Sequence, residues 1–386
     1  MGINIRNLFK KKNKYHLNPF EVRNYLHLDK KTNVKNLGYC FPIKFSNYTG
    51  KLDENQSNKC LIEEDYKEYL IILFKLASLS LDLPELNGKT LNIPDYNDNV
   101  IEIHNEKTNA YIELPNWFKN YEINLHLNDD STLNCGICKN INISLLSSFD
   151  KPIREINIQN KDYIFDKLRL TSTSRFKLNT LNNKDKKLVG KDLIYIKSGV
   201  INYNNIENIK AFNISLEDVE FDGPVEINSS HELFIYNRMC NYRDNIINSN
   251  NIIIKNEKYD YNVCILGKVN CNKLYGRIKN HYKSDDILKI EIDELTADHI
   301  DIDFAEGVTD YSNSQLSSLE RSELYIKNIK LLNDKLKLYF PVINHIGRIF
   351  MPKIILPKEI ESKIEWKVNC SKDLTLELIK QKVKWI

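Results

Sequence analysis

The chain has 386 residues, of which 42% are hydrophobic and 28% are charged, and its formal net charge is only +3. This composition excludes an intrinsically disordered chain and a generally basic nucleic-acid-binding protein. The length allows either several globular domains or one long repeat array. We therefore expect a folded protein whose partners do not include nucleic acid.

The cysteines and the apolar segments indicate the compartment. Eight cysteines are scattered along a chain whose size does not require disulfides, so we interpret them as free thiols in a reducing compartment. We find neither the apolar run of a Sec-type signal peptide nor a segment approaching the roughly 20 apolar residues of a membrane span. Delivery by a signal-independent secretion route remains compatible with this pattern.

Residues 1–36 form a basic leader with nine Lys and Arg against two Asp and Glu. An apolar helical face followed by lysines is typical of a short amphipathic segment on an anionic membrane. Gly2 is placed as in an N-myristoylation signal, although Arg6 stands where Ser or Thr is expected. The alternative is a solvated leader or a secretion signal. The predicted membrane-binding residues are Gly2, Ile5, Leu8, Phe9, Lys10, Lys11, Lys12 and Lys14.

Residues 37–88 contain the stretch "IEEDYKEYLIILFKLASLSL", in which apolar residues recur at helical spacing after an acidic first turn. Acidic residues stabilise the beginning of a helix. A coil of strands needs its ends covered, since an open rung exposes unpaired backbone and an apolar core. We therefore predict an N-terminal helical cap over residues 37–88.

Residues 89–310 are predicted to form a coil of short strands. In several runs within this range apolar pairs return every fifth residue, a spacing that fits neither a helix nor a flat strand, whereas the earlier pairs are more widely spaced. A coil with four five-residue sides would place two side chains per side inward and would stack residues about twenty apart. The pairs are Ile290/Ile292, Leu295/Ala297 and Ile300/Ile302, and earlier Ile194/Ile196, Gly199/Ile201, Asn204/Ile206, Ile209/Ala211, Ile214/Leu216 and Val219/Phe221.

This register resembles the pentapeptide-repeat family of right-handed quadrilateral β-solenoids. The resemblance implies a mainly β fold, a right-handed parallel β-helix. Ile or Val often stands where that family prefers a small residue, which predicts a swollen or flattened coil. The alternative is an antiparallel sandwich or meander, but the Asn-Gly and Asp-Gly signals of tight hairpins do not separate the strands.

Residues 311–386 are basic and are predicted to form a C-terminal cap or a small α/β domain. Cys370 lies among lysines before a predicted helix, a setting that favours a thiolate. In this respect the chain is similar to bacterial effector ubiquitin ligases that join a solenoid to a catalytic cysteine. A cysteine-dependent transferase using Cys370 is therefore one enzymatic hypothesis.

Asp298, His299 and Asp301 form the second candidate catalytic group, within an acidic stretch that also contains Glu294, Asp303 and Glu306. Clustered carboxylates perform acid/base chemistry in β-helix enzymes that cut polysaccharides. The alternative is that these residues are solubilising, since aspartates at a five-residue period lie on successive sides of a coil.

The pair in "CGIC" has no second pair at zinc-binding spacing, and Cys135 alternates with apolar neighbours like a core residue. We expect neither a metal nor a cofactor.

The leader, the composition and the degenerate repeat together resemble translocated effector proteins of bacterial pathogens; a poxvirus or protist origin fits the same composition. We therefore expect a non-enzymatic protein that is secreted without a signal peptide into a host cell. There it would bind a host protein through the solenoid surface, in the cytoplasm or at a membrane. The competing class is enzymatic: a carbohydrate-active β-helix using the acidic group near residue 300, or the Cys370 transferase.

Overall fold

The computed structural model describes residues 43–44, 59–60, 100–105, 111–114, 122–127, 130–145, 154–236, 238–256, 261–279, 287–306, 313–345, 347–369 and 376–386. Strands dominate these residues, and almost all of the strand pairs are parallel. The described chain divides into an N-terminal unit, Met1–Phe165 with Leu170–Ser174, and a C-terminal unit, Asp166–Arg169 with Arg175–Ile386.

The N-terminal unit contains two ladders of short parallel strands. One ladder pairs β1 (Ile43–Lys44), β3 (Val100–Asn105), β5 (Glu122–Leu127) and β7 (Asn140–Leu145). The other pairs β2 (Lys59–Cys60), β4 (Tyr111–Glu113), β6 (Ser131–Asn134) and β8 (Arg154–Gln159). The chain alternates between the two ladders, as a coil requires. Strand β9 (Ile164–Ser172) is divided between the two units.

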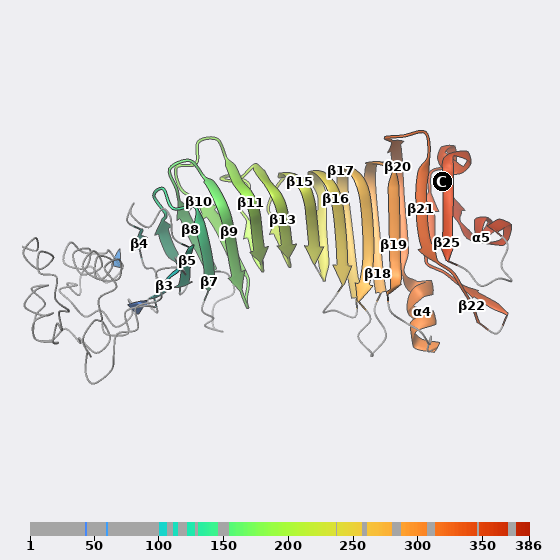
Figure 1. Cartoon of the computed structure of the whole chain (residues 1–386), viewed down its shortest axis with the longest axis horizontal. Coiled ribbons are helices and arrows are strands. Elements are labelled where there is room, and N and C mark those ends of the chain that lie inside the picture. Colours follow the sequence, from blue (N-terminus) through green and yellow to red (C-terminus); the bar gives the residue numbers. More distant parts are fainter. Residues whose placement is uncertain are drawn as a thin grey trace, which may run out of the picture. The chain divides into compact units, whose positions relative to one another are not determined.

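The C-terminal unit is a longer coil of the same kind, and its strands lie side by side in Figure 1. Its main ladder runs through β11 (Lys187–Lys197), β13 (Asn208–Glu217), β15 (Glu226–Tyr236), β16 (Met239–Asn256) and β17 (Tyr261–Lys279). A second ladder of short strands joins β10 (Phe176–Thr180), β12 (Gly199–Ile201) and β14 (Glu220–Phe221).

The ladder continues past residue 310, into the range 311–386 that was predicted to form a C-terminal cap or a small α/β domain. From β17 the pairing passes to β18 (Ile287–Ala297) and β19 (His299–Glu306), then to β20 (Glu323–Leu331) and β21 (Leu336–Pro341). It ends with β24 (Lys353–Leu356), β25 (Ile364–Asn369) and β26 (Lys384–Trp385). These strands are parallel members of the same coil.

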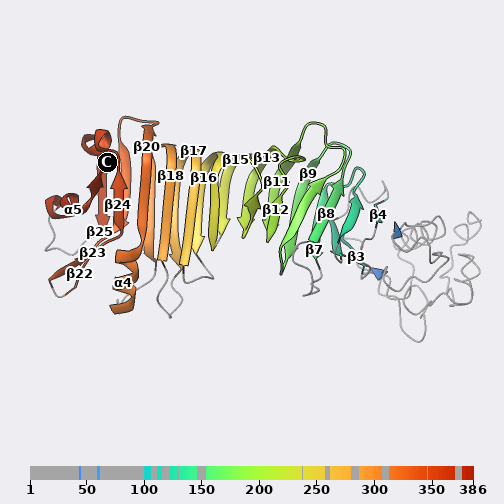
Figure 2. The ribbon, with the colours of Figure 1, turned by 180° about the vertical axis from the view of Figure 1, so that it is seen from behind.

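The other elements of the C-terminal unit lie beside the last strands of the stack, as the rear view in Figure 2 shows. They are helix α4 (Asn313–Arg321), the 3₁₀ helix η5 (Lys358–Lys363), helix α5 (Leu376–Lys382) and an antiparallel hairpin of β22 (Ile343–His345) and β23 (Arg348–Phe350). This hairpin is antiparallel, in contrast to the parallel strand pairs described above.

The parallel pairing confirms the predicted coil and excludes the antiparallel alternative for the described residues. Stacked partners lie about one predicted turn apart: Asn208 is 18 residues from Glu226, and Cys240 is 24 residues from Cys264. The predicted inward pairs are buried with two exceptions, because Asn204 is exposed in a turn and Phe221 is half-buried. The third and fourth sides of the turn are therefore less regular than the first two.

Two kinds of corner recur in successive coils. Between the first and second sides the register shifts, at Gly190/Leu193 in β11 and at Ala211/Asn213 in β13. After the second side the chain turns at Ser198 and Asp218, whose φ angles of 63° and 50° are left-handed. Polar residues that tolerate this conformation were expected at corners. Because these corners recur, equivalent sides of successive coils pair in the same register.

The predicted basic leader (1–36) and the helix within residues 37–88 lie outside the described residues, apart from the two short strands β1 and β2.

Candidate binding surface

The outward face of the second side carries a row of eight in-register residues, one from each successive coil. Seven of them lie between two buried residues of the same strand, so their side chains point away from the core. We call this set the aromatic row. It consists of Tyr195, Ser215, Phe234, Ile253, Tyr275, Asp301, Tyr339 and Lys367.

Aromatic residues occupy every second position of this row: Tyr195, Phe234, Tyr275 and Tyr339. All four are half-buried rather than covered. Neighbouring strands of a sheet lie about 4.8 Å apart, so the aromatic side chains recur about every 9.6 Å along the coil. Their separations in the sequence differ widely, and only the strand register brings them into one line.

Cations stand beside two rings of the row, Phe234 and Tyr275. The Lys255 ammonium lies 5.7 Å from the Phe234 ring centroid and 5.8 Å from that of Tyr236, and these two rings stack at 6.1 Å. The Arg277 guanidinium lies 5.4 Å from the Tyr275 ring centroid. Such contacts hold a ring in place and leave part of it exposed, because the cation covers only one side.

At the start of the row the Tyr195 hydroxyl donates a hydrogen bond of 2.7 Å to Glu217 Oε2. Lys197 binds the same carboxylate at 2.6 Å. Burial raises the pKa of Tyr195, and the hydrogen bond to Glu217 raises it further. Tyr195 therefore stays protonated, and Glu217 holds its hydroxyl in place.

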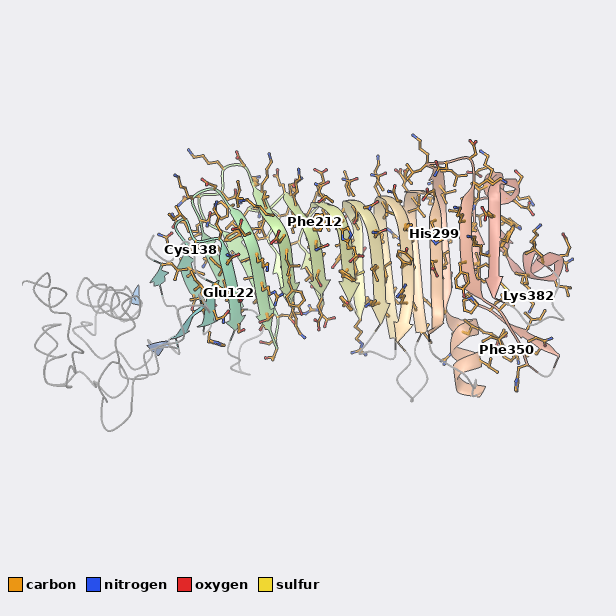
Figure 3. All side chains as sticks on the ribbon, in the orientation of Figure 1. Glu122, Cys138, Phe212, His299, Phe350 and Lys382 are labelled. Carbon is orange, nitrogen blue, oxygen red and sulfur yellow. The ribbon has the colours of Figure 1, made fainter. Side chains whose placement is uncertain are left out.

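The structure places the predicted catalytic group beside the aromatic row. His299 and Asp301 are outward residues of β19, two positions apart, and the His299 ring centroid lies 6.2 Å from that of Tyr275. Burial lowers the pKa of His299; Lys273 and Lys367 lower it further, whereas Asp301 and Asp298 oppose them. At neutral pH His299 is an uncharged donor and acceptor on this face. Figure 3 labels it on β19.

Asp298 has a structural position at a corner of the coil. Its carboxylate accepts a hydrogen bond of 2.5 Å from Asn333 Nδ2, and its backbone N–H donates to the Asn272 carbonyl at 3.4 Å. Asp298 therefore joins neighbouring coils. These bonds give Asp298 a structural role, which neither the catalytic nor the solubilising interpretation predicted.

The "CGIC" cysteines are core residues, as predicted for Cys135. Burial raises the pKa of Cys138 to about 12 and that of Cys135 well above its usual range. A redox dithiol requires the opposite shift. Cys370 and the predicted membrane-binding residues Gly2 to Lys14 lie outside the described residues.

Within the described part of the chain, no three His, Cys, Asp or Glu side chains are grouped closely enough to hold a metal ion. In the same part, the helices are too short or too polar to cross a membrane. Comparison with models of known protein families, with curated proteins and with solved structures found no match. The fold defines the chain as a mainly β protein of the parallel solenoid type.

The aromatic row escaped sequence analysis because its signal is distributed over eight coils of unequal length. The four rings stand at outward positions that the five-residue period leaves unspecified. Aligning the inward pairs of successive coils is the one sequence signal that could have found the row. That alignment fails where loops lengthen the turn: His299 pairs with Lys337, well beyond twenty residues away.

Proposed function

We propose that the chain is a non-catalytic binding protein whose aromatic row contacts a partner protein. The observation that carries the proposal is the regular line of half-buried rings with Lys255 and Arg277 beside them. Tyrosine, phenylalanine and arginine are enriched at the centres of protein interfaces. Ordered rings lose little conformational entropy on binding.

The setting follows from the sequence analysis and is part of the proposal. The chain is a translocated effector-like protein with a degenerate pentapeptide-type, right-handed coil, and its partner is a host protein. It reaches the host cell by a route that requires no signal peptide. The leader, through Gly2 to Lys14, holds it at an anionic membrane surface. The basic composition of the leader supports this step.

An enzyme is the second candidate, and the observation that favours it is a neutral His299 two residues from Asp301. A carbohydrate-active site would use these residues with Asp298. The hydrogen bond between Asp298 and Asn333 opposes this, because it uses the carboxylate for a contact between coils. The transferase hypothesis depends on Cys370.

A crosslinking experiment with matched variants tests the binding proposal. A photo-reactive amino acid replaces Ile253, at the middle of the row, and the full chain is irradiated in host-cell extract. We expect one dominant crosslinked protein, which Tyr275→Ala loses. Phe212→Ala should retain it, because Phe212 is an exposed aromatic residue of β13 that lies off the row.

Retention of the crosslink in Tyr275→Ala would refute the aromatic row as the binding site. Loss of biological activity in a folded Asp298→Asn, Asp301→Asn or Cys370→Ala variant would favour the enzymatic class instead. Deletion of residues 1–14 tests the membrane step separately: flotation with vesicles containing phosphatidylserine should decrease, while the crosslink in extract persists.

A further inference from the structure

We infer that the partner segment recognised by the aromatic row is a proline-rich stretch in the polyproline II conformation. This inference rests on the proposed function and specifies the chemistry of the partner. It follows from a match between two repeat lengths, from the shape of the row and from the charges that flank it.

The repeat length of the row selects among peptide conformations. The rings recur about every 9.6 Å, at every second strand. A polyproline II helix has three residues per turn with a rise of 3.1 Å each, so the same face recurs about every 9.3 Å. Over the three intervals from Tyr195 to Tyr339 the mismatch accumulates to about 1 Å.

Other conformations of a bound segment fit less well. An α-helix presents the same face every seven residues, about 10.5 Å, which accumulates a mismatch of nearly 3 Å over the same three intervals. An extended strand reverses its side chains at every residue, so its faces recur at about 6.6 Å or 13 Å. The row therefore fits a polyproline II helix of about ten residues lying along the coil axis.

The shape of the row also suits such a segment. Ser215, Ile253 and Asp301 stand between consecutive rings in the strand register. Proline rings pack between aromatic side chains in the peptide-binding grooves that recognise this conformation. A polyproline II backbone has no internal hydrogen bonds, so its carbonyls remain available to donors. The hydroxyl of Tyr275 is a donor of this kind.

The charges around the second half of the row indicate acidic residues in the partner segment. Lys273 and Arg277 flank Tyr275 on its own strand, and Lys337 precedes Tyr339 in the same way. Lys255 lies on the neighbouring strand β16, opposite Arg277. Asp301 is the one carboxylate in the row itself. A polyproline II segment with a glutamate in each turn would place negative charge against these cations.

The test is a binding measurement on the full chain with two labelled peptides. The first contains four Pro-Pro-Glu repeats, and the second contains four Ala-Ala-Glu repeats with the same charge and length. We expect fluorescence polarisation to show at least tenfold tighter binding of the proline peptide. Tyr275→Ala should weaken this binding at least tenfold, whereas Phe212→Ala should change it less than twofold.

Tyr275→Phe separates the ring from its hydroxyl and protects the test against misfolding. This variant keeps the packing surface, so its affinity for the proline peptide should lie between those of the wild type and Tyr275→Ala. Circular dichroism of all variants should be unchanged. A Tyr275→Ala variant that fails to fold would leave Tyr275→Phe and a Tyr339→Ala variant to decide the result in the same assay.

Two outcomes would overturn the inference. Equal binding of the two peptides would mean that charge alone attracts them, and binding of a β-1,4-linked glucose hexamer that depends on Tyr275 would assign the row to a polysaccharide. If either occurs while the crosslinked host protein still depends on Tyr275, the partner binds by another conformation and the proposed function stands. If the crosslink also persists in Tyr275→Ala, both proposals fail.

Discussion

Along the strands of the C-terminal unit, successive side chains alternate between the core and the outer face. Ile252 and Ile254 are fully buried, whereas Ile253 between them lies on the outer face. The same residue type therefore lies in the core at one position and on the outer face at the next. Replacing an outward residue should change recognition with little cost in stability, because the removed atoms have few buried contacts.

The titration of His299 tests its position on this face. Because burial lowers its pKa below the ordinary 6.5, the unfolded chain binds the proton more readily. The contribution of His299 to stability is thus complete above about pH 6.5 and is lost as the pH falls toward the folded-state pKa. Nuclear magnetic resonance of the ring protons should give a folded-state pKa below that of an unfolded peptide.

Neighbouring substitutions should move this pKa in opposite directions. Lys273→Gln removes a positive charge that lowers the pKa of His299, so the pKa should rise. Asp301→Asn removes a negative charge that raises it, so the pKa should fall. A shift of the same sign in both variants would contradict the geometry described for β19.

At the scale of elements, the sequence could predict the inward faces of the coil because that signal is local. A buried pair every fifth residue follows from the chain itself, and Ile209/Ala211 and Ile214/Leu216 confirm it. Asn204 was assigned inward because the period was extended through a turn. There Asn205 and Ile206 donate backbone hydrogen bonds to the Asn202 carbonyl, which closes a tight corner instead of a strand.

The candidate site was predictable only in part, for a physical reason. His299 and Asp301 attracted attention as a local cluster, and the structure does bring them onto one face. The rings of the aromatic row come from strands whose register depends on every corner and loop between them. Corners such as the shift at Tyr242/Ile246 are set by tertiary contacts, so the row could not be derived from local spacing.

The corner at β16 and β17 gives a prediction at the element scale. A Cβ added to Gly267 would lie 1.8 Å from the Arg243 carbonyl oxygen and 3.0 Å from that of Asn245. Both contacts are to backbone, which cannot rotate away. Gly267→Ala should therefore lower the free energy of unfolding by about 3 kcal/mol, measured by urea denaturation.

Gly347→Ala is the matched control for this prediction. Gly347 has a φ of 73° and open space around its Cβ position, so alanine there meets only the conformational cost of about 1 to 2 kcal/mol. A Gly267→Ala variant that unfolds no more easily than Gly347→Ala would show that the two coils are not so closely packed at Arg243.

In the C-terminal unit as a whole, we expect each coil to be stabilised by its contacts with the neighbouring coils. Buried aliphatic residues stack in one line directly behind the aromatic row, and each contacts the equivalents in the coils on either side. The line consists of Ile214, Leu233, Ile252, Leu274, Ile300 and Leu338. In such an array the stability is approximately a sum of intrinsic and nearest-neighbour terms.

Ile252→Ala tests this behaviour. The cavity should cost about 2 to 5 kcal/mol, because Ile252 is completely buried between Leu233 and Leu274. Hydrogen exchange should accelerate most in β15, β16 and β17 and least in β24 to β26. Ile253→Ala, one residue along the same strand, should leave exchange nearly unchanged, because its side chain faces outward. Equal acceleration across all coils would instead show that the unit unfolds as one cooperative body.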